Sequence, residues 1–336
     1  AVVFRTSPSF VRFGNFEILS SRKEYDLLEQ LLRFTIESDF PEIDPVKGVD
    51  SYLQWFTEVS RRTASMVAHW MRVGFVHGVM NSDNMSVLGL TIDYGPYGWL
   101  EGYDPTWTPN TTDAQGRRYC YGNQPYMAQW NLMQLANAIF PVIKDEKRLQ
   151  EALDSYRITF QEEWQHTLRA KIGLHTSEKH DDKMIASLLE LLTKTETDMT
   201  IFFRNLANLE VTEKDGDKLL SNVEDAFYTP EEISREHLEN LKGWLHLYRL
   251  RLLRNDLDDE ERRRKMNLVN PKYVFRNYLA QQAIDKVEAG DYSEVEALLD
   301  LFRKPYDDQP ERRHYAAKRP EWARNRPGCS MLSCSS

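Results

Sequence analysis

The fold prediction starts from residues 77–98, HGVMNSDNMSVLGLTIDYGPYG. They follow a long segment, 50–76, whose large apolar residues recur at the spacing of one helical face. The quoted stretch predicts a polar loop, then a short apolar strand over 87–92, then a glycine-punctuated turn. The order along the chain is therefore helix, loop, strand and an Asp-Tyr-Gly turn that begins at Asp93.

Protein kinases share this order, because their HRDxxxxN loop precedes a strand that ends in DFG. In that layout the Asn and the second Asp hold the magnesium that bridges nucleotide phosphates. Asn84 and Asp93 stand at the matching places, whereas Val79 replaces the catalytic Asp. A valine cannot deprotonate a hydroxyl, which is typical of a pseudokinase, but Asp83 offers a carboxylate in the same loop. The alternative is that Asp83 and Asn84 only form a turn and Asp93 caps one.

Asn84 and Asp93 also suit a divalent cation on chemical grounds. A hard cation prefers oxygen ligands from short side chains, and a carboxamide and a carboxylate supply them. We expect Mg²⁺ or Mn²⁺ here, with its other ligands taken from water and phosphate. His77 is an alternative base, although a histidine that closes an amphipathic helix is more often structural.

Composition narrows the range of partners. The 336 residues carry 43 Lys and Arg against 52 Asp and Glu, a net charge of -9, so nucleic acid is not an expected partner. The short basic run 262–264 is interpreted as a solvated helix face. No stretch approaches the roughly 18 apolar residues that a membrane-spanning helix needs. We therefore expect neither a nucleic-acid nor a membrane partner.

The three cysteines, Cys120, Cys329 and Cys334, are too few and too scattered for a disulfide framework or a structural zinc site. A reducing compartment is the default expectation. Cys329 and Cys334 are interpreted as exposed thiols of the tail, without function.

The rest of the chain is predicted to be mainly helical. Residues 1–16 suggest two short strands, and 100–126 form an irregular segment of the length that is often functional. The predicted helices cover 24–37, 127–140, 145–171, 181–209, 217–228, 230–255, 271–289 and 292–302. Past Pro305 the polar, proline-containing chain suggests a flexible tail.

Four blocks of the sequence together resemble the selenoprotein O family. They are RTSPSFVRFGNFE (5–17), the quoted stretch 77–98, QPYMAQWNLMQLA (124–136) and MNLVNPKYVFRNYLAQQAIDKVEAGDYSEVEALL (266–299). The resemblance implies a kinase-like fold that binds ATP in a flipped orientation. It also implies transfer of AMP, rather than phosphate, onto hydroxyl side chains of proteins.

The resemblance assigns roles to individual residues. Arg5 and Arg12 match arginines that hold the phosphates of the inverted nucleotide, a task that suits a guanidinium fork. Asp83 matches the proposed proton acceptor. Asn84 and Asp93 match the metal ligands, and Asp93 also faces the nucleotide.

The expected fold class is α+β, protein-kinase-like, mostly the helical C-lobe with a few short strands and a helical C-terminal extension. The expected parts are an N-lobe remnant (1–20), the C-lobe (21–210), the extension (211–304) and the tail (305–336). No G-x-G-x-x-G precedes Arg5, and a lysine-glutamate pair is also missing there. We therefore predict that this chain alone binds ATP poorly or not at all.

Two other functions stay open on the sequence alone. One is a kinase-like phosphotransferase with Asp83 as the base, and the other is a nucleotide-free helical interaction module. Animal members of the resembled family are mitochondrial, which is the expected location, and they carry selenocysteine where Cys334 stands here. A cysteine at that place is mostly thiol at neutral pH, so we expect a weakened redox role.

Overall fold

The computed structural model describes residues 5–329 and 332. In this range the protein is α+β and mostly helical, with one two-stranded sheet. The chain divides into two compact units. The first contains the chain up to His69, Val79–Gly95 and Gly122–Glu163; the second contains Trp70–Gly78, Pro96–Tyr121 and the chain from Trp164 onward.

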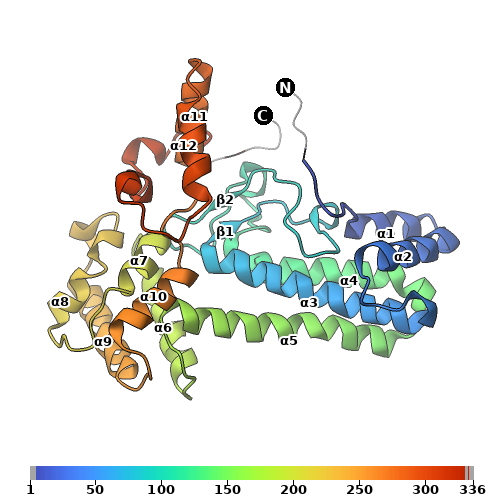
Figure 1. Ribbon diagram of the computed structural model, residues 1–336, viewed down its shortest axis with the longest axis horizontal. Helices are drawn as coiled ribbons and strands as arrows, with labels where there is room; N and C mark the ends of the chain where they lie inside the picture. The colour runs from blue at the N-terminus through green and yellow to red at the C-terminus, as the bar shows by residue number, and fades with distance from the viewer. Residues whose placement is uncertain (1–4, 330–331, 333–336) are drawn as a thin grey trace. The chain divides into compact units, whose positions relative to one another are not determined.

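The first unit consists of helices and of the loop that carries the candidate site (Figure 1). Its elements are α1 (Phe13–Ser21), α2 (Tyr25–Asp39), η1 (Pro45–Lys47), most of α3 (Val49–Val73), η2 (Ser82–Asn84), α4 (Gln124–Ile143) and most of α5 (Glu146–Lys171).

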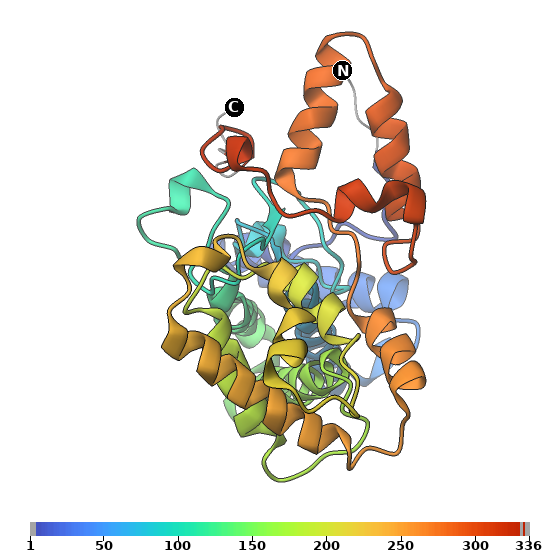
Figure 2. The same cartoon turned by 90° about the vertical axis from the view of Figure 1, so that its left-hand side faces the viewer.

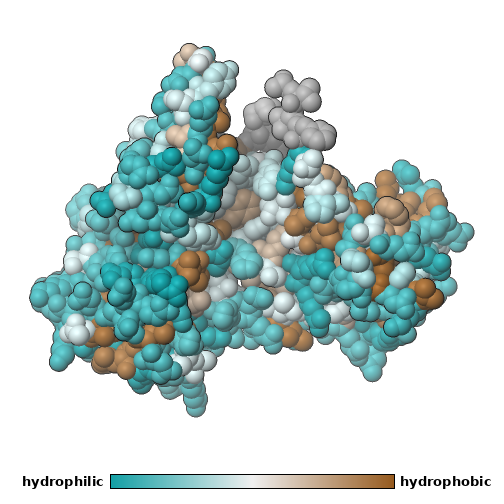
Figure 3. Space-filling model, in the orientation of Figure 1, coloured by the Kyte–Doolittle hydropathy of each residue, from teal (hydrophilic) through white to brown (hydrophobic). Residues whose placement is uncertain are grey.

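The core of the first unit is formed by aromatic side chains at helical spacing. Phe13 and Phe16 of α1 are fully buried, and the Phe16 ring lies 5.1 Å from that of Trp55 on α3. Burial of such side chains supplies most of the free energy that holds short helices in place. The outer faces of α1 and α2 stay partly apolar (Figure 3), where Ile18, Leu27 and Phe34 are about half exposed.

The second unit is also mostly helical. Its elements are β1 (Phe75–Val76), β2 (Gly98–Trp99), η3 (Thr111–Asp113), α6 (Asp181–Leu192), α7 (Met199–Leu206), α8 (Gly216–Ser221), η5 (Glu224–Ala226), η6 (Pro230–Glu232), α9 (Arg235–Leu252), α10 (Asp259–Val269), α11 (Asn277–Glu288), α12 (Ser293–Phe302), η7 (Pro310–Ala316) and η8 (Glu321–Ala323). β1 and β2 pair antiparallel, with Phe75 opposite Trp99. α11 and α12 run beside each other (Figure 2).

The strands predicted over 1–16 and 87–92 are wrong within the described residues. Phe13 begins a helix, because burial of Phe13 and Phe16 three residues apart requires helical rather than strand periodicity. Of residues 87–92, only Thr91 takes part in a bridge, with Met85, and a second isolated bridge joins Arg12 and Ser86. Val87 and Ile92 are buried without forming a strand, whereas Leu90 is 37% exposed.

The helices predicted in the second half are confirmed with different boundaries, and one was missed. The predicted helix 181–209 is two helices, because the Asp198 side chain accepts a hydrogen bond from the Ile201 N–H and starts α7. α10 was not predicted. Its Arg262 is only 1% exposed and pairs with Asp259 at 2.9 Å, so the interpretation of this run as a solvated face is wrong for Arg262.

The flexible tail predicted past Pro305 is also wrong for the described residues. Tyr315, Ala323 and Cys329 are buried in a cluster with side chains of α11 and α12. Arg319 forms ion pairs with Glu101 at 2.8 Å and with Glu196 at 2.7 Å. Cys329 is thus a buried thiol whose pKa is raised by burial, whereas Cys334 lies outside the described residues.

Candidate functional site

The loop that carries Asp83 and Asn84 is a single turn of 3₁₀ helix, η2. The backbone N–H of Asn84 donates to the Asn81 carbonyl at 3.0 Å. The Asn84 side-chain Nδ2 donates to the Val79 carbonyl at 2.8 Å. The NH₂ group of the Asn84 side chain is used in this bond, so the amide oxygen is the remaining polar atom of that side chain.

Arg12 reaches this loop because the chain before α1 runs beside the residues after η2. The Phe13 N–H donates to the Met85 carbonyl at 3.1 Å, and the Val87 N–H donates to the Val11 carbonyl at 3.2 Å. Arg12 lies between these two bonds. Its Nη1 donates to the Asp83 carbonyl at 2.9 Å.

The same Arg12 guanidinium forms an ion pair with the Asp93 carboxylate. Both side chains are about one-third exposed, at 31% for Arg12 and 38% for Asp93. Asp93 has φ = 52°, in the left-handed region that few residues other than glycine adopt at low cost, although Asp tolerates it better than most. Backbone strain of this kind is concentrated at functional sites.

Arg5 contacts the same chain segment. Its Nη2 donates to the Thr91 carbonyl at 2.8 Å, and its guanidinium lies 4.2 Å from the centre of the Tyr94 ring. Both arginines thus contact the chain segment 91–94, Arg12 at Asp93 itself and Arg5 at Thr91 and Tyr94.

The Asp83 carboxylate is exposed and lies against the first turn of α1. A Cβ added at Gly14 would come within 1.9 Å of Asp83 Oδ1, so only glycine leaves that position of the carboxylate open. Nearby, Glu17 has a raised pKa, because burial disfavours its charged form; a hydrogen bond with Ser82 lowers the pKa, and the charge of Asp83 raises it further. Glu17 and Gly14 were not predicted from the sequence.

α4 contacts the chain just before η2. The Asn131 side chain is fully buried, and its Nδ2 donates to the Met80 carbonyl at 2.8 Å. This bond fixes the segment that leads into Asp83.

The structure therefore gathers all five predicted site residues in the first unit: Arg5, Arg12, Asp83, Asn84 and Asp93. Their chemical roles stay predictions. The alternative base, His77, belongs to the second unit and is 1% exposed, with its ring 5.5 Å from that of Trp70. Such burial suits a structural histidine.

Asn84 and Asp93 supply only part of the ligand set that a divalent cation needs. Among the described residues, no three His, Cys, Asp or Glu side chains gather as a metal-binding group. The pair offers one amide oxygen and one carboxylate, and the carboxylate already faces the positive charge of Arg12. This donor set fits a hard cation that takes its remaining ligands from water and phosphate, as Mg²⁺ does, rather than a closed protein cage.

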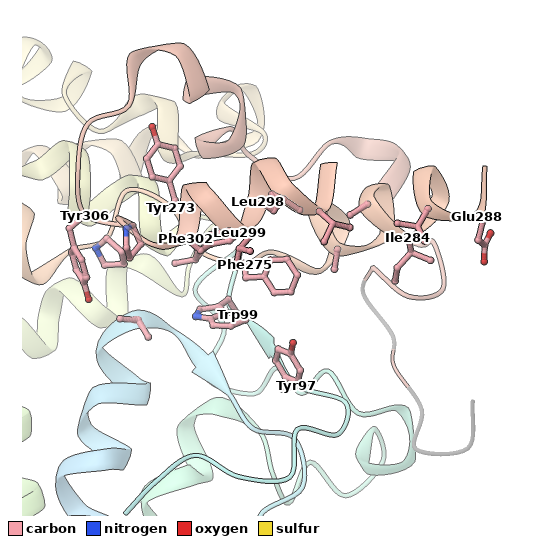
Figure 4. A pocket seen from close by; sticks show the side chains of 18 residues that line it. Tyr97, Trp99, Tyr273, Phe275, Ile284, Glu288, Leu298, Leu299, Phe302 and Tyr306 are labelled. Atoms are coloured by element: carbon pink, nitrogen blue, oxygen red, sulfur yellow. The ribbon is translucent and has the colours of Figure 1, made fainter. Parts of the chain in front are cut away.

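A separate apolar cavity of about 860 Å³ lies in the second unit (Figure 4). Trp99, Phe275, Leu298 and Phe302 are among its lining side chains, and Glu288 is the one charged residue among those that line it in the described part of the chain. Most of the side chains that line this cavity are apolar or aromatic. In the described residues there is also no helix with the length and apolar character needed to span a membrane.

Comparisons with known proteins identify relatives of this chain. A family model described as "Protein adenylyltransferase SelO" matches residues 1–303. The chain is 53% identical over 350 residues to a protein named "Protein nucleotidyltransferase YdiU" from Rhodopirellula baltica, covering 100% of this chain and 65% of the relative. Proteins of the same name from Azoarcus sp. and Flavobacterium johnsoniae are 54% and 53% identical, again over 100% of this chain and 64% of each relative.

The chain spans just under two thirds of the length of these curated relatives. The family match nevertheless covers the first unit, the second unit up to residue 303 and every predicted site residue. The four sequence blocks and the comparisons lead to the same result: the chain belongs to the selenoprotein O (SelO) family.

Proposed function

We propose that this chain carries the catalytic centre of a protein adenylyltransferase, which transfers AMP from ATP to Ser, Thr or Tyr hydroxyls of proteins. The observation that carries the proposal is the position of Arg12. One guanidinium contacts both the loop of the candidate base Asp83 and the candidate metal ligand Asp93. A phosphate chain bound at that guanidinium would lie beside Asp93 and beside the loop that carries Asp83.

Arg5 and Arg12 are the proposed phosphate-binding residues. Both present guanidinium groups to the segment around Asp93, and a guanidinium donates two parallel hydrogen bonds to phosphate oxygens without losing its charge. If these arginines hold the terminal phosphates of ATP, the α-phosphorus is the atom left open to attack. That orientation favours AMP transfer over phosphate transfer.

Asn84 and Asp93 are the proposed ligands of Mg²⁺ or Mn²⁺. When bound, such an ion neutralises charge on the phosphoryl oxygens. Asp93 would then bind the cation instead of Arg12, and the Arg12 guanidinium would donate hydrogen bonds to phosphate oxygens instead. Partial exposure of both side chains allows this exchange without opening the core.

Asp83 is the proposed general base. Its exposed carboxylate can accept the proton of a substrate hydroxyl as the hydroxyl oxygen bonds to the α-phosphorus. The bond from that phosphorus to the bridging oxygen breaks, and pyrophosphate leaves with the bonding electrons. The kinase catalytic Asp is replaced by Val79, so a kinase-like fold used in this way would be a pseudokinase in the conventional sense.

Because the relatives are longer than this chain, the test uses a chimera in which residues 1–303 replace the matching part of the Rhodopirellula baltica protein. ATP labelled at the α or the γ position is supplied with Mg²⁺ and an acceptor protein. Label retained from the α position alone is the expected result, and Asp93→Asn should lower it by about a hundredfold. Retention of γ label would support a phosphotransferase instead. No transfer of either label by a chimera that binds ATP would contradict both.

A further inference from the structure

A groove of about 710 Å³ lies in the second unit between α6, η6 and α9. None of the site residues assigned above lines it. Its apolar lining includes Leu191, Trp244 and Leu247. Trp244 is 4% exposed and is fixed in place, because its Nε1 donates to the Met184 carbonyl at 2.8 Å and its ring stacks on Tyr248 at 5.1 Å. Leu247, by contrast, is 60% exposed. The groove thus has a rigid apolar base and an apolar side chain in contact with solvent.

Gly243 lies in the middle of α9 and lines the same groove. A glycine inside a helix costs about 1 kcal/mol relative to alanine. Packing in the described residues does not explain this cost, since an added Cβ would meet nothing within 4 Å. The missing side chain instead leaves an open place on the helix surface, next to Trp244, where another chain can approach closely.

The rim of the groove is acidic. Four glutamates line it, Glu190, Glu232, Glu236 and Glu239, against one lysine, Lys194. The pKa of His237 is lowered by burial and by the charge of Lys194, so this histidine is neutral at neutral pH and does not offset the glutamates.

Two of the four glutamates already have a lysine partner within the chain: Glu190 pairs with Lys194 at 3.5 Å, and Glu239 pairs with Lys242 at 3.1 Å. The other two are available to a partner. Within the described part of the chain, Glu232 and Glu236 have no ion pair, and both are exposed. A ligand with positive charges on either side of an apolar group would match this pattern.

The length of the groove favours a peptide. Its α9 residues run from Glu236 to Leu247, which is about 16 Å at 1.5 Å per residue. An extended peptide covers that distance with about five residues. We propose that this groove binds a basic peptide segment of a partner protein, with an apolar side chain seated over Gly243 and flanking Lys or Arg paired with Glu232 and Glu236. This binding needs neither nucleotide nor metal and does not depend on the transfer reaction.

The test uses a fluorescein-labelled nine-residue peptide of alternating Lys and Arg with leucine at its centre, titrated with the whole chain by fluorescence anisotropy. The key variant is Gly243→Leu, whose side chain fills the groove. Leucine is also a better helix former than glycine, so this variant should unfold at the same or a higher temperature. We expect saturable binding to the unmodified chain, and binding at least about tenfold weaker in the variant, the equivalent of about 1.4 kcal/mol.

Two charge-matched variants separate the groove from the general negative charge of the chain. Glu232→Gln with Glu236→Gln should weaken binding, whereas Glu162→Gln with Glu260→Gln, exposed glutamates outside the groove, should not. A peptide with Glu in place of Lys and Arg should not bind. The chain carries a net charge of -9, so equal losses in both double variants would identify nonspecific attraction and overturn the proposal.

Two further outcomes would also overturn it. One is no saturable binding of the peptide, or unchanged binding in a folded Gly243→Leu variant. The other is self-association seen by sedimentation that Gly243→Leu abolishes while the peptide does not compete, which would assign the groove to a second copy of this chain.

Discussion

Two arginine-aspartate pairs in this protein differ sharply in their surroundings. Arg276 and Asp198, in the second unit, are 1% and 0% exposed and form two bonds of 2.7 and 3.0 Å. Arg12 and Asp93, in the first unit, are about one-third exposed. The same two functional groups thus lie in the core in one pair and are partly exposed in the other, with different consequences.

The buried pair organises structure. Asp198 also accepts hydrogen bonds from the Ile201 N–H at the start of α7 and from the Tyr228 hydroxyl at 3.0 Å. Burial alone would lower the pKa of Arg276, but attraction and hydrogen bonding to Asp198 outweigh it and raise the pKa. Because both groups are buried and bonded to each other, they are not available to a ligand. The exposed pair can exchange partners, which suits binding of phosphate and metal.

The largest effect is expected from breaking the buried pair. Arg276→Met leaves the Asp198 carboxylate buried without its cation, which costs about 3–5 kcal/mol of unfolding free energy. Urea unfolding followed by circular dichroism measures the change. A loss below about 1 kcal/mol would show that the pair is not a structural centre of the second unit.

Breaking the exposed pair should leave stability almost unchanged but lower the rate of AMP transfer. Asp93→Asn keeps a residue that tolerates the left-handed backbone but removes the charge, so stability should change by less than about 1 kcal/mol. AMP transfer by the chimera should fall by about a hundredfold. Unfolding curves and transfer rates are measured on the same preparations. Full activity in Asp93→Asn would remove the functional distinction between the two pairs.

A smaller effect on the transfer rate is expected from a change at Gly14, which lies against the Asp83 carboxylate. Gly14→Ala forces the Asp83 carboxylate to move, since the new Cβ would lie 1.9 Å from Oδ1. Displacement of a candidate base should lower the transfer rate by about tenfold or more while ATP binding persists. Gly216→Ala is the matched control, because its Cβ meets Lys242 only at 3.6 Å or more. Equal rates in the two variants would mean that the observed position of Asp83 is not needed.

The smallest effect concerns Glu17. Its folded pKa is raised above the ordinary value of 4.5, so the folded state holds the proton more tightly than the unfolded state. Stability contributed by this group is therefore present at pH 4 and decreases as the pH rises through the folded pKa. Glu17→Gln should flatten the stability profile between pH 4 and pH 7. An unchanged profile would show that Glu17 is not the group that titrates there.

Part of the site could be predicted from the sequence because it is local. Asn84 and Asp93 occur within one short stretch with a known order of residues, and Asp83 is adjacent. Arg5 and Arg12 could not be assigned on spacing, and only the resemblance to a family singled them out. Their contacts with Thr91 and Asp83 join positions more than 70 residues apart.

The features that were missed depend on tertiary contacts. Gly14 and Glu17 matter only because α1 packs against η2, and the sequence suggested strands where α1 begins. Arg262 appeared to be one of three solvated arginines, but its guanidinium donates to the Leu209 carbonyl in the core. The segment past Pro305 was predicted to be flexible, because its own sequence is polar and contains prolines. Its burial comes from contacts with α11 and α12, which the local sequence does not reveal.

The most direct test of the proposed chemistry is the mass of an acceptor protein after incubation with the chimera, ATP and Mg²⁺. Addition of one adenylyl group at a Ser, Thr or Tyr side chain is expected, and Asp83→Asn and Arg12→Ala should each suppress it. Addition of a phosphoryl group, or an adenylyl group that persists in both variants, would contradict the assignment of these residues.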